Sequence, residues 1–513
     1  MKRTKRKYNA GRLAKMARVA VSMVMLAAVT VVFTVVEGWA AQWFGWTARI
    51  EIMPLALAGA GTTLAFWFGA TLLLGRVYCS WMCPMGAVQD CFAHMRRMTR
   101  RMKARHPYRW SEGKNRFRYA LLMVVVASAV AGVPLLLSLS DPYSVYGRVA
   151  SEMLLPVKQW VTGDPVALGS WMALGIAAAT LAAVGITACL RGRLVCNTVC
   201  PVGSTLSVLS RYALFHFDID TDVCVNCRKC ERACKSECIN MADHVVDGSR
   251  CVACFNCVDV CDHKAISYTF RRKKLSLPLM QPVNTAAAAP TVKTDATGGH
   301  GGCDRQADRA VKVDRRQFLA TGLIVAAAPA LSVAAKGKQR IKAISNPGKA
   351  IAVKRAVAPP GRRSMGEFLE RCTGCGLCVA RCPAKVLRPS TDEFGWLNML
   401  HPVMDFDKSY CRYNCTRCSD VCPTGALLPL TEEEKHIFII GHARVVAENC
   451  IGCGLCASRC PRKAIVMAAR KPGQGGGSPL TAQVDTDLCI GCGACQYICP
   501  ATPEKAIGVE GIS

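Results

Sequence analysis

Six cysteine runs, each holding four cysteines within eleven or twelve residues, constrain this chain more than any other feature. In five runs the spacing is Cys-x2-Cys-x2-Cys-x3-Cys, and in the run that begins at Cys411 the first gap is one residue longer. Three thiolates at this spacing surround one iron–sulfur cubane, and the fourth reaches a neighbouring cluster, so such runs work in pairs. Three pairs predict about six [4Fe–4S] clusters and a chain that transfers electrons.

The crossing of the fourth cysteine predicts six ligand sets, each named here by its first cysteine. Proline follows the last cysteine in the four later runs, whereas Lys235 and Asp262 replace it in the first two. Cys238 is an additional candidate ligand, so the choice between Cys234 and Cys238 stays open. The sets are Cys224, Cys227, Cys230 and Cys261; Cys251, Cys254, Cys257 and Cys234; Cys372, Cys375, Cys378 and Cys422; Cys411, Cys415, Cys418 and Cys382; Cys450, Cys453, Cys456 and Cys499; and Cys489, Cys492, Cys495 and Cys460.

Two other uses of the 32 cysteines fit the sequence less well. A disulfide framework is typical of short secreted chains, and this chain has 513 residues. Zinc sites usually pair two Cys-x2-Cys units across a longer gap. A fourth cysteine close behind the third, followed by proline, is the pattern of an iron–sulfur ligand run.

Four apolar stretches precede the first cluster run, at 19–36, 52–75, 119–139 and 171–190, and none contains a charged residue. Each is close to the length of about 20 residues that crosses a bilayer, so they predict four membrane spans. No histidine lies in any of them, which excludes bis-histidine haem b within the membrane. Cys-x-x-Cys-His is also absent from the sequence, which argues against c-type haem.

The lysines and arginines predict the orientation of these spans. Residues 1–18 carry eight and residues 76–118 carry eleven, whereas the loops 37–51 and 140–170 carry one and two. By the positive-inside rule, the N-terminus, the 76–118 loop and the segment after residue 190 are cytoplasmic in a bacterial inner membrane. The net charge of +30 is therefore interpreted as membrane topology, and no nucleic-acid partner is expected.

The predicted membrane part contains a duplication. Residues 75–86 align with residues 192–203, and each copy holds a Cys-x3-Cys-Pro motif, formed by Cys79 and Cys83 and by Cys196 and Cys200. Two parallel repeats of two spans are therefore predicted. The motif cysteines are candidates to bind a metal or a seventh cluster, to act as a redox dithiol, or to shape a quinol pocket. Buried free thiols that only pack are the alternative.

A fifth apolar run follows Arg315 and Arg316, and a twin arginine before such a run is typical of a Tat export signal. The predicted fold is a membrane α-helical domain with four spans in two parallel repeats, a fifth signal-anchor span, and α+β dicluster modules of the bacterial ferredoxin type. The predicted domains are a membrane domain at 1–217, a cytoplasmic dicluster module at 218–270, a flexible linker at 271–313, the signal segment at 314–336 and a periplasmic polyferredoxin domain at 337–513.

Residues 1–270 resemble NapH/MauN-type membrane proteins, and residues 310–513 resemble NapG/MauM-type polyferredoxins. The second resemblance rests mainly on the motif YCRYNCTRCSDVCPTG at 410–425. The departure from both families is that the two are fused. The resemblance implies a quinol dehydrogenase subunit that takes electrons from menaquinol or ubiquinol. It also implies delivery to a periplasmic reductase, most often nitrate reductase, or to a c-type cytochrome.

Three functions follow from these features. The first is an electron conduit from the quinone pool, the second is a maturation factor for a periplasmic metalloenzyme, and the third is a redox sensor. The sequence lacks a glycine-rich nucleotide fingerprint between a strand and a helix, which argues against NAD or ATP chemistry. A conduit leaves one gap, because clusters are predicted on both membrane faces with no recognised cofactor between them. Either quinol bridges this gap or the Cys-x3-Cys-Pro region holds a further group.

Overall fold

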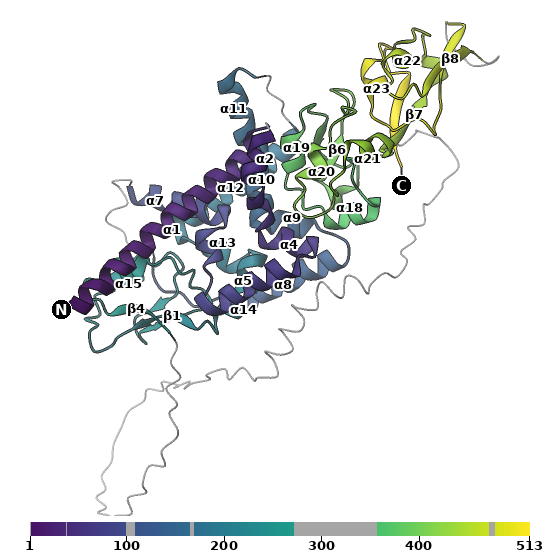
Figure 1. Ribbon diagram of the computed structural model, residues 1–513. Coiled ribbons are helices and arrows are strands. Elements are labelled where there is room, and N and C mark those ends of the chain that lie inside the picture. The colour runs from purple at the N-terminus through teal and green to yellow at the C-terminus, as the bar shows by residue number, and fades with distance from the viewer. Residues whose placement is uncertain are drawn as a thin grey trace, which may run out of the picture.

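The computed structural model describes residues 2–36, 38–98, 108–164, 169–270, 356–470 and 478–512. Figure 1 shows a helical N-terminal part with a small sheet module at one end and a cysteine-rich C-terminal part at the other. The predicted linker and the predicted signal segment with Arg315 and Arg316 lie outside the described residues.

The described N-terminal part is mostly helical, and its helices are short apart from α1 and α12. Their bounds are α1 (Lys2–Thr34), α2 (Gly38–Phe44), α3 (Trp46–Arg49), α4 (Ile52–Ala58), α5 (Gly61–Leu74), α6 (Tyr78–Trp81), α7 (Pro84–Met98), α8 (Asn115–Val130), α9 (Leu135–Ser140), α10 (Pro142–Val149), the π-helix η2 (Ala150–Leu154), α11 (Leu155–Thr162), α12 (Trp171–Arg191), α13 (Leu194–Thr198) and α14 (Pro201–Ser210).

Among the described residues, two helices are long and apolar enough to cross a membrane, the Gly11–Thr34 part of α1 and the whole of α12. The other two predicted spans are not single helices. The 52–75 stretch breaks into α4 and α5 at Gly59, which ends α4 in the left-handed conformation with φ 75°. The 119–139 stretch breaks between α8 and α9, where Gly132 has φ 77° and Pro134 follows. Glycine adopts positive φ without a steric penalty and proline removes a helix donor, so both stop a helix that hydropathy alone would continue.

The predicted loop 140–170 is largely helical. Asp141 caps α10, because its Oδ2 accepts from the main-chain N–H of Ser144 at 2.8 Å and Pro142 occupies the first turn. Both are strong helix-start signals. Every residue of α10 is buried. The loop therefore forms part of the helical core.

The first cysteine-rich module is built on two small antiparallel sheets. Strands β1 (Phe215–Ile219) and β4 (Ile266–Phe270) pair along their whole length, as do β2 (Ile239–Asn240) and β3 (Val245–Val246). The helices α15 (Lys229–Ala233) and α16 (Asn256–Asp259) carry cysteines of the two runs. Such modules have a small core, so bound clusters contribute much of their stability.

The described C-terminal part has one small antiparallel sheet in its first half and two in its second half. Its three sheets are antiparallel pairs, β5 with β6, β8 with β9, and β10 with β7. The bounds are α18 (Met365–Arg371), α19 (Leu377–Arg381), β5 (Leu387–Pro389), η3 (Trp396–Asn398), β6 (Pro402–Met404), α20 (Arg417–Asp420), α21 (Glu432–Ile437), β7 (Gly441–Val445), η4 (Ala447–Asn449), α22 (Leu455–Arg459), β8 (Ile465–Ala469), β9 (Leu480–Val484), α23 (Ala494–Ile498) and β10 (Ile507–Gly511).

The two cysteine-rich parts contact opposite ends of α1 (Figure 1). In the N-terminal half of α1, Lys15 Nζ lies 2.6 Å from Asp259 Oδ2 of the first module. Beyond its C-terminus, Arg417 Nη1 of the C-terminal part donates to the carbonyl oxygen of Val36 at 3.1 Å. A helix rises 1.5 Å per residue, so the two contacts are about 30 Å apart along the axis, which matches the hydrocarbon thickness of a bilayer.

Candidate iron–sulfur centres and the buried path between them

The structure brings together the four cysteines of each predicted set in the C-terminal part. Each set lines a cavity of its own, and in every case the fourth cysteine comes from the other run of its pair. Within the described residues, no three cysteine, histidine or acidic side chains converge closely enough to hold a single metal ion. The cysteines surround cavities instead, which is the arrangement that a cubane with four outward thiolate ligands requires.

Glycines at positive φ lead into the helix that carries the third cysteine. Gly376, Gly454 and Gly493 precede α19, α22 and α23 with φ of 76°, 72° and 79°. In the first module, Arg228 and Phe255 occupy the equivalent positions with φ of 56° and 61°. A non-glycine residue in this region costs roughly 1–2 kcal/mol, so the module holds this loop shape against local preference.

The four C-terminal sets lie in a spatial order that differs from their sequence order. Burial raises the pKa of Cys378, and Cys418 of the 411 set is among the thiols that raise it further. The main-chain N–H of Cys411 donates to the carbonyl oxygen of Cys492 at 2.9 Å, which joins the 411 and 489 sets. Helices α22 and α23 pack together and join the 489 and 450 sets. The order is therefore 372, 411, 489 and 450.

In the first module, the 224 set lines one cavity. The 251 set is also grouped, because Cys254, Cys251 and Cys234 all add to the rise in the pKa of Cys257 that burial causes. Cys238 Sγ lies 3.4 Å from Cys234 Sγ. Both candidates for the crossing ligand therefore lie beside the 251 set.

The duplication predicted from the sequence has a matching local structure in its two copies. Gly75 and Gly192 both have positive φ, and α7 and α14 begin at the prolines of the two motifs. All four motif cysteines are buried, with exposed fractions of 4–7%. They are Cys79, Cys83, Cys196 and Cys200.

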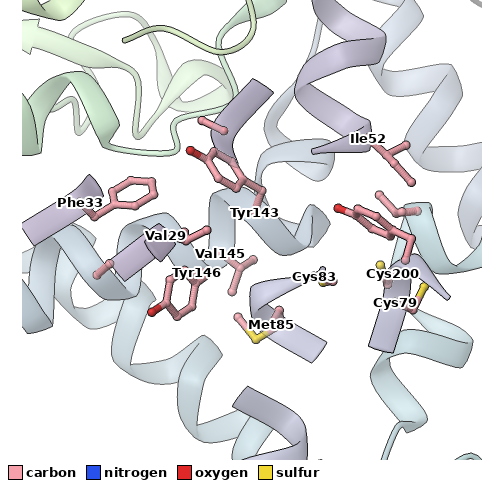
Figure 2. Close-up of a cluster of buried hydrophobic side chains, with 14 of the residues drawn as sticks. Val29, Phe33, Ile52, Cys79, Cys83, Met85, Tyr143, Val145, Tyr146 and Cys200 are labelled. Carbon is pink, nitrogen blue, oxygen red and sulfur yellow. The ribbon is translucent and has the colours of Figure 1, made fainter. Parts of the chain in front are cut away.

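The four motif cysteines are neighbours across the repeat interface. Burial raises the pKa of Cys83, and the charges of Glu51, Cys196, Cys79 and Cys200 raise it further, which places all three other thiols near it. Figure 2 shows Cys79, Cys83 and Cys200 within one buried cluster that also contains Tyr143 and Tyr146.

An arginine at the equivalent position of each repeat contacts the main chain of the other repeat. Arg76 of the first repeat donates through Nη2 to the carbonyl oxygen of Cys196 at 3.1 Å, and Arg193 of the second donates to the carbonyl oxygen of Cys79. A Cβ on Gly86 would collide with Cys79 O and approach Arg193, and a Cβ on Gly203 would collide with Cys196 O and approach Arg76. Both glycines are therefore required for this close approach.

Asp90 forms ion pairs both with Arg193, beside the motif cysteines, and with Lys235 of the first module. Burial disfavours its charge, but Arg193, Lys235 and Arg18 surround it and hold the pKa of Asp90 well below its usual range. Burial lowers the pKa of Arg193, whereas Asp90, Cys196 and Cys254 act in the opposite direction and raise it. Arg193 therefore lies near both a motif cysteine and the 251 set.

A group of buried acids and tyrosines also adjoins the motif cysteines. Tyr78 Oη donates to Glu51 Oε2, and burial raises the pKa of Glu51 to about 8. Burial raises the pKa of the Cys200 and Cys375 thiols, and the charge of Asp141 raises both further. Asp141 therefore faces a motif cysteine and the 372 set. Tyr143, in the same core, is also near Cys375.

Sequence reasoning missed this acidic group. Its only signal was that Glu51 directly precedes one apolar stretch and Asp141 closely follows another. Both positions read as loop residues until the structure shows that they are 1% and 0% exposed.

Comparisons with known proteins agree with the cysteine pattern. A family model described as a 4Fe-4S binding domain matches residues 56–103 and 172–220. Models described as 4Fe-4S dicluster domains match residues 371–426, 449–502 and 403–461. The chain carries multiple 4Fe–4S clusters.

Several curated proteins are similar over part of the chain. An uncharacterized protein of Methanocaldococcus jannaschii is 28% identical over 38% of this chain and 65% of its own length. The ferredoxin-type protein NapH of Haemophilus influenzae is 26% identical over 42% of this chain and 69% of its own length. The methylamine utilization ferredoxin-type protein MauM of Paracoccus denitrificans is 30% identical over 29% of this chain and 66% of its own length. No solved structure matches the chain.

These matches each span about two thirds of the relative's length. The chain is an iron–sulfur electron-transfer protein related to NapH and MauM.

Proposed function

We propose that this chain is a membrane-bound conduit that oxidises quinol and delivers the electrons to a periplasmic acceptor, a reductase of the nitrate reductase type or a c-type cytochrome. The observation that carries the proposal is a buried acidic pair, in which Glu51 lies near the motif cysteine Cys83 and Asp141 lies near both Cys200 and Cys375 of the 372 set. Each bound cluster would supply a one-electron relay that needs no proton.

The placement in the membrane rests on the charge asymmetry and on the packing along α1. The two apolar helices, and the separation of about 30 Å between the contacts that the two modules make along α1, fit one bilayer thickness. The broken helices α4–α5 and α8–α9 complete a bundle of four spans in this proposal. Broken helices are tolerated in a bilayer where neighbouring helices satisfy the exposed backbone groups. The fifth span and the Tat signal would place the C-terminal part in the periplasm.

The acidic group supplies what quinol oxidation requires. Oxidation of a quinol releases two electrons and two protons, so the site needs buried groups that accept hydrogen bonds and protons. Among the described residues, Glu51 Oε1, Asp141 Oδ1 and Tyr143 Oη are buried without a hydrogen-bond partner. Buried polar atoms are normally satisfied, so three unpaired oxygens in one core fit a site for a polar ligand. Glu51 and Asp141 would accept the quinol hydroxyl protons.

The far end of the C-terminal part supports an exit for electrons. Cys453 of the 450 set is exposed, whereas most other cysteines of the part are buried or half-buried. Beside it, Ile451 and Leu455 are 57% and 42% exposed. An exposed ligand with apolar neighbours fits transient docking of a redox partner.

Quinol-driven reduction of the intact, cluster-loaded protein in nanodiscs tests this proposal. Quinol should bleach the visible absorbance of the clusters, and Glu51→Gln should slow this bleaching about 100-fold, because general base catalysis typically contributes that much or more. The matched control is Glu112→Gln, an exposed acid of the same helical part that should behave as wild type. Dithionite should bleach all three proteins equally.

Failure of quinol to reduce any cluster that dithionite reduces would overturn the conduit. The maturation alternative would then lead, and the chain would be needed only while its client enzyme assembles.

A further inference from the structure

We propose that Cys79, Cys83, Cys196 and Cys200 together hold one iron–sulfur centre that the two repeats share. The family model for a 4Fe-4S binding domain matches each repeat separately. Each repeat, however, contributes only two motif cysteines, which is half of the ligand set of a cubane. One shared centre uses all four thiols and leaves neither repeat with an incomplete site.

Two reciprocal arginine contacts hold the motif cysteines in place at the interface between the repeats. Arg76 reaches from the first repeat to the main chain of Cys196, and Arg193 reaches from the second to that of Cys79. Arg76 Nη2 also lies 3.8 Å from Cys79 Sγ. Each arginine thus fixes the backbone that presents the other repeat's first cysteine.

The charge balance of the interface calls for an anion. Arg76 and Arg118 are 0% and 1% exposed, and their hydrogen-bond acceptors are side-chain oxygens of Asn197 and Ser204, main-chain oxygens and Cys79 Sγ. None of these acceptors is a carboxylate. Buried charges are normally paired with an opposite charge. A centre with four thiolate ligands carries net negative charge and would supply it.

At the second cysteine of each motif, a helix N-terminus offsets part of the cost that burial imposes on a thiolate. Cys83 and Cys200 immediately precede the prolines that open α7 and α14. The main-chain N–H of Gly203 donates to Cys200 Sγ at 3.3 Å. Helix N-termini lower the cost of a thiolate and are common positions for metal-binding or reactive cysteines.

The position of this centre fills the gap between the two groups of clusters. Arg193, which donates to the carbonyl oxygen of Cys79, also lies near Cys254 of the 251 set, and Asp141 lies near both Cys200 and Cys375 of the 372 set. The centre would accept one electron and pass on one electron, with no bond formed or broken and no proton taken up. Its role as a relay rests on the proposed function, whereas its existence does not.

Iron content of the full-length, anaerobically purified protein tests the proposal. Cys79→Ala should remove about four irons per chain if the centre is a cubane, or about two if it is a [2Fe–2S] cluster. Cys196→Ala, in the other repeat, should remove the same number, and the double variant should remove no more than either single one. The matched controls are Cys91→Ala and Cys189→Ala, half-buried thiols of the same two repeats that should lose none.

The six ferredoxin-type sets serve as the folding control within each sample. Their electron paramagnetic resonance signals should persist in both motif variants. Equal iron content in motif variants and controls, with those signals intact, would overturn the proposal in favour of packed free thiols. Additive losses from the two single variants would overturn sharing, and zinc in place of iron would overturn the redox role. Reduction by quinol is measured in a separate experiment. If quinol fails to reduce the protein, the iron-content result still decides whether the shared centre exists.

Discussion

The main-chain N–H of Cys411 donates to the carbonyl oxygen of Cys492 across 2.9 Å, and this bond joins two cysteine sets that the sequence separates by a complete third set. The 450 set, third in the sequence, is therefore last in space. Figure 1 shows α22 and β8, which flank this set, far from the helical part. A linear relay would end at Cys453.

This order predicts opposite results for two cluster deletions. Cys453→Ala should leave the 489 set reducible by quinol, because that set precedes the 450 set in space. Cys495→Ala should cut off the electron supply to the 450 set, so that dithionite reduces this set and quinol does not. Freeze-quench electron paramagnetic resonance checks both variants. The reverse pattern would mean that electrons follow the sequence order.

Asp90 should be far more important for stability than the other acids that pair with α1. Asp90→Asn leaves Arg18, Arg193 and Lys235 buried without their counter-charge, and we expect a loss of about 3–5 kcal/mol. The matched control is Asp259→Asn, which breaks a partly exposed pair with Lys15 and should cost about 0–1 kcal/mol. Chemical unfolding in detergent measures both variants. Similar losses from the two would show that the Asp90 cluster is not tightly coupled.

Glycines at the repeat interface should respond differently from glycines on the helix surface. Gly86→Ala and Gly203→Ala each force a Cβ against a cysteine carbonyl and should destabilise the protein by about 1–3 kcal/mol. Gly175→Ala in α12 meets nothing within 4 Å and should stabilise by up to about 1 kcal/mol through helix propensity. Thermal unfolding compares the three. A gain at Gly86 or Gly203 would contradict the close packing of the repeats.

The pH dependence of quinol oxidation should report the raised pKa of Glu51. Burial raises this pKa to about 8, partly offset by the hydrogen bond from Tyr78, while the charge of Asp141 raises it further. A proton acceptor works in its deprotonated form, so the rate should increase from pH 6, reach about half of its maximum near pH 8 and level off only above that pH. Glu51→Gln should be slow and nearly independent of pH over this range. A wild-type rate that falls as pH rises would exclude Glu51 as the acceptor.

The sequence by itself predicted the ligand sets and revealed the duplication. Cysteine spacing is a local property, because three thiolates on one short loop fix where a cluster can bind, and the crossing of the fourth follows from the pairing of runs. The motifs at Cys79 and Cys196 were visible as a repeat for the same reason. Their shared local structure, with a positive-φ glycine before each motif and a proline that opens the next helix, depends on neighbouring residues only.

Tertiary structure decided the relationships between these units. The helix breaks at Gly59 and Gly132 depend on backbone conformation, which mean hydropathy does not register. The reciprocal contacts of Arg76 and Arg193 join residues more than a hundred positions apart. The burial of Glu51 and Asp141 arises only when helices of both repeats enclose them. Contacts at such separation are specified by packing of the whole chain, so the route from one group of cysteines to the other could be read only from the folded protein.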